Sequence, residues 1–136
     1  MNRIILASHG GLARGMCDTA QFFGMGDGVE VLEQTALESG FEQRARALLE
    51  RHSGDNCIVF TDIIGGSVNQ TFTKLLTEYS FHLVSGMNLG MVLECGAESG
   101  AIDSDFIRDI VAASAEQTCY MNDRLSVLLQ SSDEDD

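Results

Sequence analysis

Residues 57–67 read Cys-Ile-Val-Phe-Thr-Asp-Ile-Ile-Gly-Gly-Ser, and they are the main basis of the fold that we predict for the 136-residue chain. Its first part, Cys57 to Thr61, is almost entirely apolar, which is typical of a strand buried on both faces of a parallel sheet. Asp62 to Ser67 then forms a glycine-containing turn that opens a helix. A buried strand, a turn and a helix in this order indicate one unit of an α/β fold.

The same alternation continues on both sides of this stretch. Short runs of aliphatic and β-branched residues predict strands over residues 2–8, 29–32, 57–61 and 81–85. Apolar residues at helical spacing predict helices over residues 12–23, 39–54, 67–79, 88–98 and 104–117, the second of them starting with a capping box at residues 39–42. The sequence therefore predicts an α/β fold: one doubly wound domain with a mainly parallel four-stranded sheet, helices on both faces, and a short C-terminal strand at residues 119–121.

Length and composition fit a single domain. Apolar residues make up 44% of the chain and charged residues 21%, close to the average of globular proteins. We place this domain at residues 1–122 and a C-terminal extension at residues 123–136, whose acidic end, from residue 131, we expect to be disordered. No apolar run approaches the ~20 residues of a membrane span, and the run at residues 4–7 is too short for a signal peptide. We therefore expect a cytoplasmic protein without direct membrane insertion.

Charge and cysteine spacing exclude two classes of function. The formal net charge of −13, with only 8 Lys and Arg residues, argues against nucleic-acid binding, which needs a basic surface. The cysteines at positions 17, 57, 95 and 119 form no C-x-x-C pair. They therefore indicate buried free thiols in a reducing compartment, and neither a zinc site nor any other metal site is predicted.

Two segments carry the candidate chemistry, because ligands of doubly wound sheets bind beyond the carboxyl ends of the strands, where the strand order reverses. His9 follows the first strand, and Asp62 follows the third. If these strands are neighbours, Asp62 accepts a hydrogen bond from Nδ1–H of His9, which leaves Nε2 as a nucleophile. An imidazole ordinarily titrates near pH 6.5, so a large fraction is neutral at pH 7. We interpret His52 and His82 as structural.

The turn after Asp62 resembles an anion site. Gly65 and Gly66 let the backbone approach a ligand, and the following helix offers free N–H groups and a partial positive charge. Ser67 either adds a hydroxyl donor or only caps the helix. With Gly10 beside His9, these residues form a predicted phosphate-binding set. A Walker motif, a G-x-G-x-x-G motif and an acidic magnesium cluster are all missing from the sequence, so we predict no cofactor. Together the parts describe a phosphoryl acceptor.

Three segments resemble the enzyme IIA component of the mannose-family phosphotransferase system (PTS): residues 4–16, 60–69 and 83–94. The resemblance implies that His9 accepts a phosphoryl group from the phosphocarrier protein HPr. It also implies that His9 passes the group to a histidine of enzyme IIB, for uptake of a sugar of the mannose, fructose, sorbose or amino-sugar class. The family's carboxylate matches Asp62, and its phosphate-contacting turn matches Gly66 and Ser67. It further implies a homodimer that exchanges a C-terminal strand, here residues 119–121.

The chain departs from the family pattern at two places where the family has proline, namely Val68 and Gly90. Three alternatives to the relay stay open at this point. One is a receiver-like module phosphorylated on Asp62. Another is a hydrolase built from Ser67, His9 and Asp62, although the G-x-S-x-G pattern is incomplete. The last is a regulatory or sensor domain of the same fold, whose phosphorylation state controls a partner.

Overall fold

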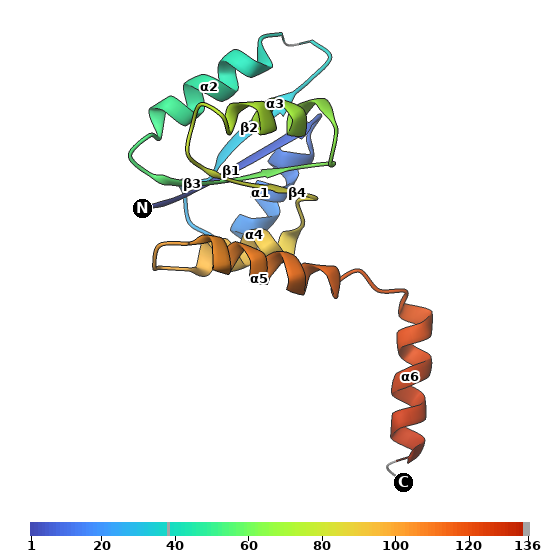
Figure 1. Ribbon diagram of the computed structural model, residues 1–136. Helices are drawn as coiled ribbons and strands as arrows, with labels where there is room; N and C mark the ends of the chain where they lie inside the picture. The colour runs from blue at the N-terminus through green and yellow to red at the C-terminus, as the bar shows by residue number, and fades with distance from the viewer. Residues whose placement is uncertain (38, 135–136) are drawn as a thin grey trace.

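The computed structural model describes residues 1–37 and 39–134. Strands and helices alternate through the first four strands and are followed by three helices (Figure 1). In chain order the elements are β1 (Asn2–His9), α1 (Leu12–Phe22), β2 (Glu30–Gln34), α2 (Phe41–Arg51), β3 (Asn56–Thr61), α3 (Ser67–Leu75), β4 (His82–Ser85), α4 (Leu89–Ala97), α5 (Ser104–Ala115) and α6 (Met121–Glu134).

The four strands form a parallel sheet in the order β2-β1-β3-β4. This order confirms the predicted α/β fold. It also makes the first and third strands neighbours, which is the condition on which the predicted contact between His9 and Asp62 depends. The chain starts in the middle of the sheet, moves outward to β2, and returns past β1 to β3. The strand order therefore reverses between β1 and β3, and their carboxyl ends form the switch point. Ala7 of β1 pairs with Thr61 of β3.

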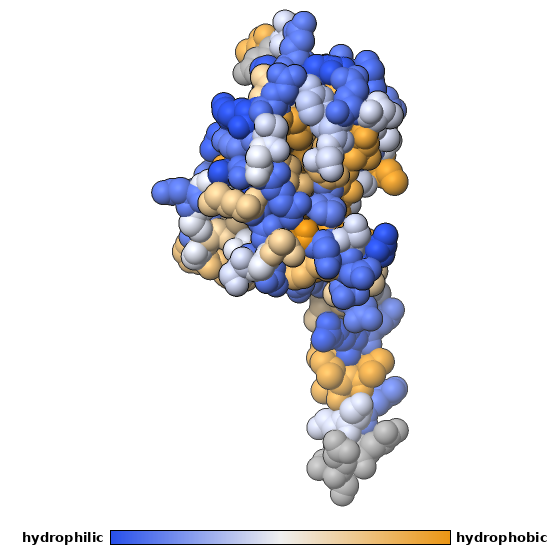
Figure 2. All heavy atoms as spheres, turned by 60° about the vertical axis from the view of Figure 1, so that its left-hand side comes forward, coloured by the Kyte–Doolittle hydropathy of each residue, from blue (hydrophilic) through white to orange (hydrophobic). Residues whose placement is uncertain are grey.

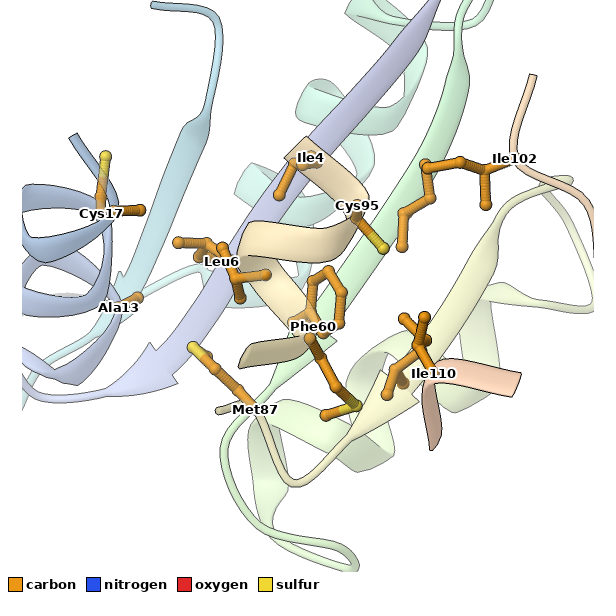
Figure 3. Packing of buried hydrophobic residues seen from close by; sticks show 14 residues of the cluster. Ile4, Leu6, Ala13, Cys17, Phe60, Met87, Cys95, Ile102 and Ile110 are labelled. Atoms are coloured by element: carbon orange, nitrogen blue, oxygen red, sulfur yellow. The ribbon is translucent and has the colours of Figure 1, made fainter. Parts of the chain in front are cut away.

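Helices cover both faces of the sheet and enclose two apolar clusters (Figure 1). On one face, α2 and α3 pack over a cluster that includes Ile5, Val59 and Phe72. On the other face, α1, α4 and α5 pack over a cluster in which Leu6 and Phe60 are completely buried (Figure 3). Since successive residues of a strand point to opposite faces, the nearly continuous apolar run of β3 supplies both clusters.

The start of α2 differs from the predicted capping box. The structure ends the loop at Gly40, which has a φ of 75° and serves as the N-cap without a side-chain hydrogen bond. A left-handed backbone is open to glycine at no steric cost, and it moves the first helical residue to Phe41. Ser39 is therefore not the capping residue.

The C-terminal segment corrects a prediction. Residues 119–121 form no strand, since 118–120 lack regular structure and Met121 begins α6. Apolar residues at helical spacing explain this helix, namely Met121, Leu125, Leu128 and Leu129. Their side chains stay exposed because α6 projects away from the domain (Figures 1 and 2). Residues 131–134, which we expected to be disordered, continue α6, and residues 135–136 lie outside the described part. No helix in the described ranges is long and apolar enough to cross a membrane.

Candidate functional site

The candidate site lies at the carboxyl edge of the sheet, where β1 and β3 end side by side. His9 is the last residue of β1, and Asp62 directly follows the last residue of β3. The parallel register between the two strands brings both residues to the same level of this edge. The position of each residue therefore follows from the strand that precedes it, and neither depends on a long loop.

Asp62 holds His9 through two hydrogen bonds. Oδ2 of Asp62 accepts from the backbone N–H of His9 at 2.8 Å and lies 2.7 Å from Nδ1 of the ring. Its other oxygen, Oδ1, accepts from the backbone N–H of Ile63 at 2.9 Å. Burial raises the pKa of Asp62, but these hydrogen bonds outweigh it and hold the pKa below its ordinary value of 3.8. Asp62 is therefore ionised at neutral pH.

The charge state of Asp62 decides which ring nitrogen of His9 is available. A carboxylate can only accept hydrogen bonds, so Nδ1 of His9 must carry a proton and donate it. In the neutral ring Nε2 then keeps its lone pair, as the sequence predicted. The imidazole side chain is 45% exposed, whereas the Asp62 side chain is 11% exposed. The ring of His9 is thus accessible to solvent, and the carboxylate that is hydrogen-bonded to it is shielded.

Ser67 faces the free nitrogen of His9. Its Oγ lies 2.8 Å from Nε2. Ser67 is the first residue of α3, but the N-cap is Gly66, and no side-chain hydrogen bond caps the helix. The capping role that we weighed for Ser67 is therefore not observed, and its hydroxyl remains directed at the ring. An imidazole, a carboxylate and a hydroxyl thus form one hydrogen-bonded series at the start of a helix.

The predicted phosphate-binding glycines shape the site by their backbone conformation. Gly10 and Gly65 have φ values of 56° and 78°, which side chains rarely allow. A Cβ on Gly66 would lie 2.9 Å from Cγ2 of Ile63 and 3.3 Å from Cε1 of His9. Glycine at position 66 therefore permits the close approach of the turn to the ring.

The N–H groups of these three glycines are already engaged in hydrogen bonds. Gly10 N donates to the carbonyl of Gln34 at 2.9 Å, Gly66 N donates to the carbonyl of Ile63 at 3.2 Å, and Gly65 N donates to Asn69 Oδ1 at 3.2 Å. The donors left for an anion are the first N–H groups of α3, which have no carbonyl partner within their own helix. Ser67 Oγ is the side-chain donor beside them.

Sequence reasoning assigned no role to two further polar residues at this edge. Asn69 is buried, donates to Thr61 Oγ1 at 2.9 Å, and accepts from Gly65, so it ties the turn to the end of β3. Gln34 ends β2, pairs in register with His9, and accepts a hydrogen bond from Ser67 Oγ at 3.0 Å. Gln34 lies two residues beyond the predicted end of its strand, so the prediction did not place it at the edge of the sheet.

The other histidines lie away from this edge. His52 follows α2 and its ring contacts two carboxylates, with Nε2 3.1 Å from Glu30 and Nδ1 3.3 Å from Asp55. His82 is the first residue of β4, at the opposite end of the strand from the site. Within residues 1–37 and 39–134, no group of His, Cys, Asp or Glu side chains is arranged to hold a metal ion. All four cysteines are free thiols.

Comparisons with known proteins agree with this architecture. The model of the EIIA-man family, described as the PTS system fructose IIA component, matches residues 3–112. A crystal structure from Klebsiella pneumoniae subsp. pneumoniae MGH 78578, described as a phosphoenolpyruvate-dependent sugar PTS permease, is 30% identical. It has a TM-score of 0.79, with 91% of this chain and 93% of that chain covered. A comparison with curated protein sequences found no match.

Two further solved structures are similar. The PTS IIA protein associated with the fucose utilization operon of Streptococcus pneumoniae is 26% identical, with a TM-score of 0.80 and coverage of 91% of this chain and 96% of that one. The mannose/sorbose-specific IIA subunit from Enterococcus faecalis is 20% identical, with a TM-score of 0.79 and coverage of 87% and 92%. The family match spans most of the chain and the folds agree, so the chain belongs to the EIIA-man family and is a mannose-family IIA component of a sugar phosphotransferase system.

Proposed function

We propose that His9 is the phosphoryl carrier of this component, accepting a phosphoryl group from HPr and passing it to a histidine of enzyme IIB. The observation that carries the proposal is the series Asp62–His9–Ser67. It leaves Nε2 of an oriented, exposed imidazole beside a hydroxyl and a helix N-terminus. The membership in the EIIA-man family supports a phosphoryl relay at this site.

The geometry supports the following transfer step. The lone pair of His9 Nε2 attacks phosphorus, an N–P bond forms, and the bond from phosphorus to the carrier breaks with its electron pair going to the carrier. The ring gains positive charge, which the ionised Asp62 stabilises through the hydrogen bond from Nδ1. Ser67 Oγ and the first N–H groups of α3 are placed to donate to the phosphoryl oxygens. Apart from the N–P bond to His9, the site contributes mainly positioning and charge stabilisation.

The surroundings of His9 suit a protein as donor and acceptor. Leu12, Ile63 and Ile64 flank the site and are at least half exposed. An open hollow of about 420 Å³ adjoins it, between α1 and the start of α4, and is lined by Gly11, Leu12, Gly15, Met16, Thr19 and Leu89. Exposed apolar side chains around a reactive group are typical of a docking surface. We assign this surface to HPr and to enzyme IIB. We also propose that the protein is a homodimer. The free thiols fit a location in the cytoplasm, because thiols stay reduced there.

Hydrolysis is a second candidate, because the same three side chains have the contacts of a serine hydrolase triad. Ser67 Oγ, His9 and Asp62 are linked by distances of 2.8 and 2.7 Å. The two functions demand different roles of Ser67, since a hydrolase uses its Oγ as the nucleophile and a relay uses it only as a donor. Ser67→Ala therefore separates them: it abolishes hydrolysis of an activated ester but only slows phosphorylation of His9.

A receiver-like role for Asp62 fits the geometry poorly. Both carboxylate oxygens already accept hydrogen bonds, and the side chain is 11% exposed. The metal that aspartyl phosphorylation requires has no acidic cluster to bind it in the described ranges. A regulatory domain of the same fold would share the phosphorylation chemistry and differ only in its partner.

The experiment that tests the relay uses the full chain with phosphoenolpyruvate, enzyme I and HPr, followed by mass analysis. We expect a gain of one phosphoryl group that is labile to acid and is lost in His9→Ala. His82→Ala serves as the matched control and should keep the gain. Transfer from the phosphorylated chain to enzyme IIB then distinguishes a relay from a regulatory domain. No gain with any HPr, or an unchanged gain in His9→Ala, would overturn the proposal.

A further inference from the structure

Gln34 occupies a place beside the candidate site that the family resemblance does not assign to any role. It is the last residue of β2, and the parallel register sets it directly opposite His9. Its backbone carbonyl accepts from Gly10 N at 2.9 Å, which fixes the backbone of residue 34 against the loop after His9. Its side chain then reaches over the edge, and Oε1 lies 3.0 Å from Ser67 Oγ.

Ser67 has one proton for two partners. Within the described residues, its Oγ is hydrogen-bonded to His9 Nε2 and to the amide of Gln34. If the His9 ring is protonated on both nitrogens, Nε2–H donates to Oγ and the hydroxyl donates to Oε1 of Gln34. If Nε2 holds a lone pair, the hydroxyl must donate to it, and Gln34 must turn its NH₂ end toward Oγ. The Gln34 amide can hydrogen-bond to Ser67 Oγ in both protonation states of the ring, because it carries a donor and an acceptor.

The amide is free to make this turn. Gln34 is half-buried, and its side chain makes no other hydrogen bond in the described part of the chain, so turning costs it no existing partner. Two carboxylates at this edge, those of Asp62 and Glu33, do not take the place of the Gln34 amide as a partner of Ser67 Oγ. Asp62 is engaged with His9 and Ile63, and Oε2 of Glu33 lies on the Gly11 side of the loop, 3.7 Å from where a Cβ of Gly11 would stand.

Phosphorylation creates a further demand on Ser67. In the resting site its Oγ stands 2.8 Å from Nε2, on the side from which phosphorus must approach the lone pair. When the N–P bond forms, the hydroxyl loses Nε2 as an acceptor and has to turn its proton toward a phosphoryl oxygen. We propose that Gln34 is a positioning residue of this site, whose amide holds Ser67 Oγ in place while the hydroxyl changes partner from Nε2 to the phosphoryl group. The inference rests on the proposed function, because it assigns Gln34 to the same transfer step.

Three variants separate the possible roles of Gln34. Gln34→Met keeps the length of the side chain and removes both hydrogen-bonding ends. Gln34→Glu keeps the length and the acceptor, loses the donor, and adds a negative charge beside the phosphoryl group. Gln21→Met is the matched control, since Gln21 is exposed near the far end of α1. The backbone hydrogen bond from Gly10 to residue 34 is retained in every variant, so the edge of the sheet should stay folded.

The first readout is the rate of phosphorylation by phospho-HPr under single-turnover and steady-state conditions. For Gln34→Met we expect kcat to fall about fivefold to tenfold, the loss of one neutral hydrogen bond in the transition state, with KM unchanged. Gln34→Glu should be slower still, and Gln21→Met should match the wild type. In a Ser67→Ala background, Gln34→Met should have no further effect, because Gln34 acts through Ser67. A wild-type kcat in Gln34→Met, a loss confined to KM, or full additivity with Ser67→Ala would overturn the proposal.

The second readout needs no phosphoryl donor, so it stays decisive if the proposed relay itself fails. The ¹⁵N resonances of the His9 ring are recorded at about pH 8.5, well above the range in which imidazoles ordinarily titrate. The new carboxylate in Gln34→Glu competes for the Ser67 proton, so the Nε2 resonance should move toward that of a lone pair without a hydrogen bond. Gln34→Met leaves Nε2 as the only acceptor and should keep the wild-type resonance. Identical spectra for the wild type and Gln34→Glu would overturn the proposed coupling of Gln34 to His9 through Ser67, whether or not HPr phosphorylates the protein.

Discussion

Replacing Asp62 by asparagine removes the group that sets the state of His9. Oδ2 of Asp62 receives two N–H groups from His9, at 2.8 and 2.7 Å, and Oδ1 receives the N–H of Ile63 at 2.9 Å. An amide has only one oxygen for these three donors. If the oxygen faces His9, the NH₂ group of the amide meets the N–H of Ile63. If the NH₂ group faces His9, it meets the backbone N–H of His9 and favours the ring tautomer that protonates Nε2.

The size of the effect follows from these contacts. The Nδ1–H hydrogen bond to a carboxylate becomes a neutral one or is lost, and a hydrogen bond to a charged group contributes about 1.5–3 kcal/mol. If that stabilisation acts on the ring as it gains positive charge, the rate falls about 10-fold to 150-fold. The nucleophile is still present, so transfer is slowed and not abolished.

The assay is rapid-quench measurement of His9 phosphorylation with excess labelled phospho-HPr. Asp105→Asn is the matched control, because Asp105 is 87% exposed on α5 and its ion pair is with Arg108, three residues away. We expect the wild-type rate in the control. A rate in Asp62→Asn within twofold of the wild type, for a variant that folds normally, would refute the assignment of Asp62 as the orienting carboxylate.

Three further predictions concern the same edge and the core. Gly66→Ala should lower the phosphorylation rate about tenfold or more, because the added Cβ would stand 3.3 Å from His9 Cε1. Gly54→Ala is the control: Gly54 lies in the turn after α2, a Cβ there would meet no atom within 4 Å, and the rate should stay at the wild-type value. Only the exposed thiol of Cys119 should react with a thiol reagent in the native protein, as counted by mass; reaction of more than one thiol before unfolding would contradict the burial of the rest. The other three thiols are those of Cys17, Cys57 and Cys95, and burial raises the pKa of each of them, in Cys95 to about 12. Folding lowers the pKa of Asp62, so the contribution of this carboxylate to the free energy of unfolding is complete above its ordinary pKa of 3.8 and is lost as the pH falls below that value. The difference in free energy of unfolding between the wild type and Asp62→Asn, measured by denaturant unfolding, should therefore become smaller on acidification. A difference that stays constant with pH would contradict this.

The central sheet could be predicted because its signal is local. The apolar run of β3 and the buried residues of β1 identify strands without reference to the rest of the chain, and the parallel topology follows from their alternation with helices. The rule that ligands bind where the strand order reverses directed attention to His9 and Asp62. Their proximity follows once β1 and β3 are neighbours, because the carboxyl ends of the two strands then meet at one edge of the sheet. This part of the site needed only the strand order and the position of each strand's end.

The remaining details depend on contacts that local patterns do not encode. The short strand expected at residues 119–121 has no partner strand within residues 1–37 and 39–134, and the helical spacing that begins at Met121 prevails. Gln34 reaches Ser67 only because β2 extends two residues further than its apolar run and pairs in register with β1. Asn69 acts through a buried hydrogen bond to Thr61, which becomes visible only once α3 is packed on the sheet.

We propose that the phosphoryl group is bound to Nε2 of His9. The most direct test is a ¹H–¹⁵N long-range correlation spectrum of the phosphorylated full chain, which distinguishes the two ring nitrogens of His9. We expect phosphorus on Nε2, with Nδ1 still protonated and hydrogen-bonded to Asp62. Phosphorus on Nδ1, or a phosphoryl group that hydroxylamine removes from Asp62, would contradict it.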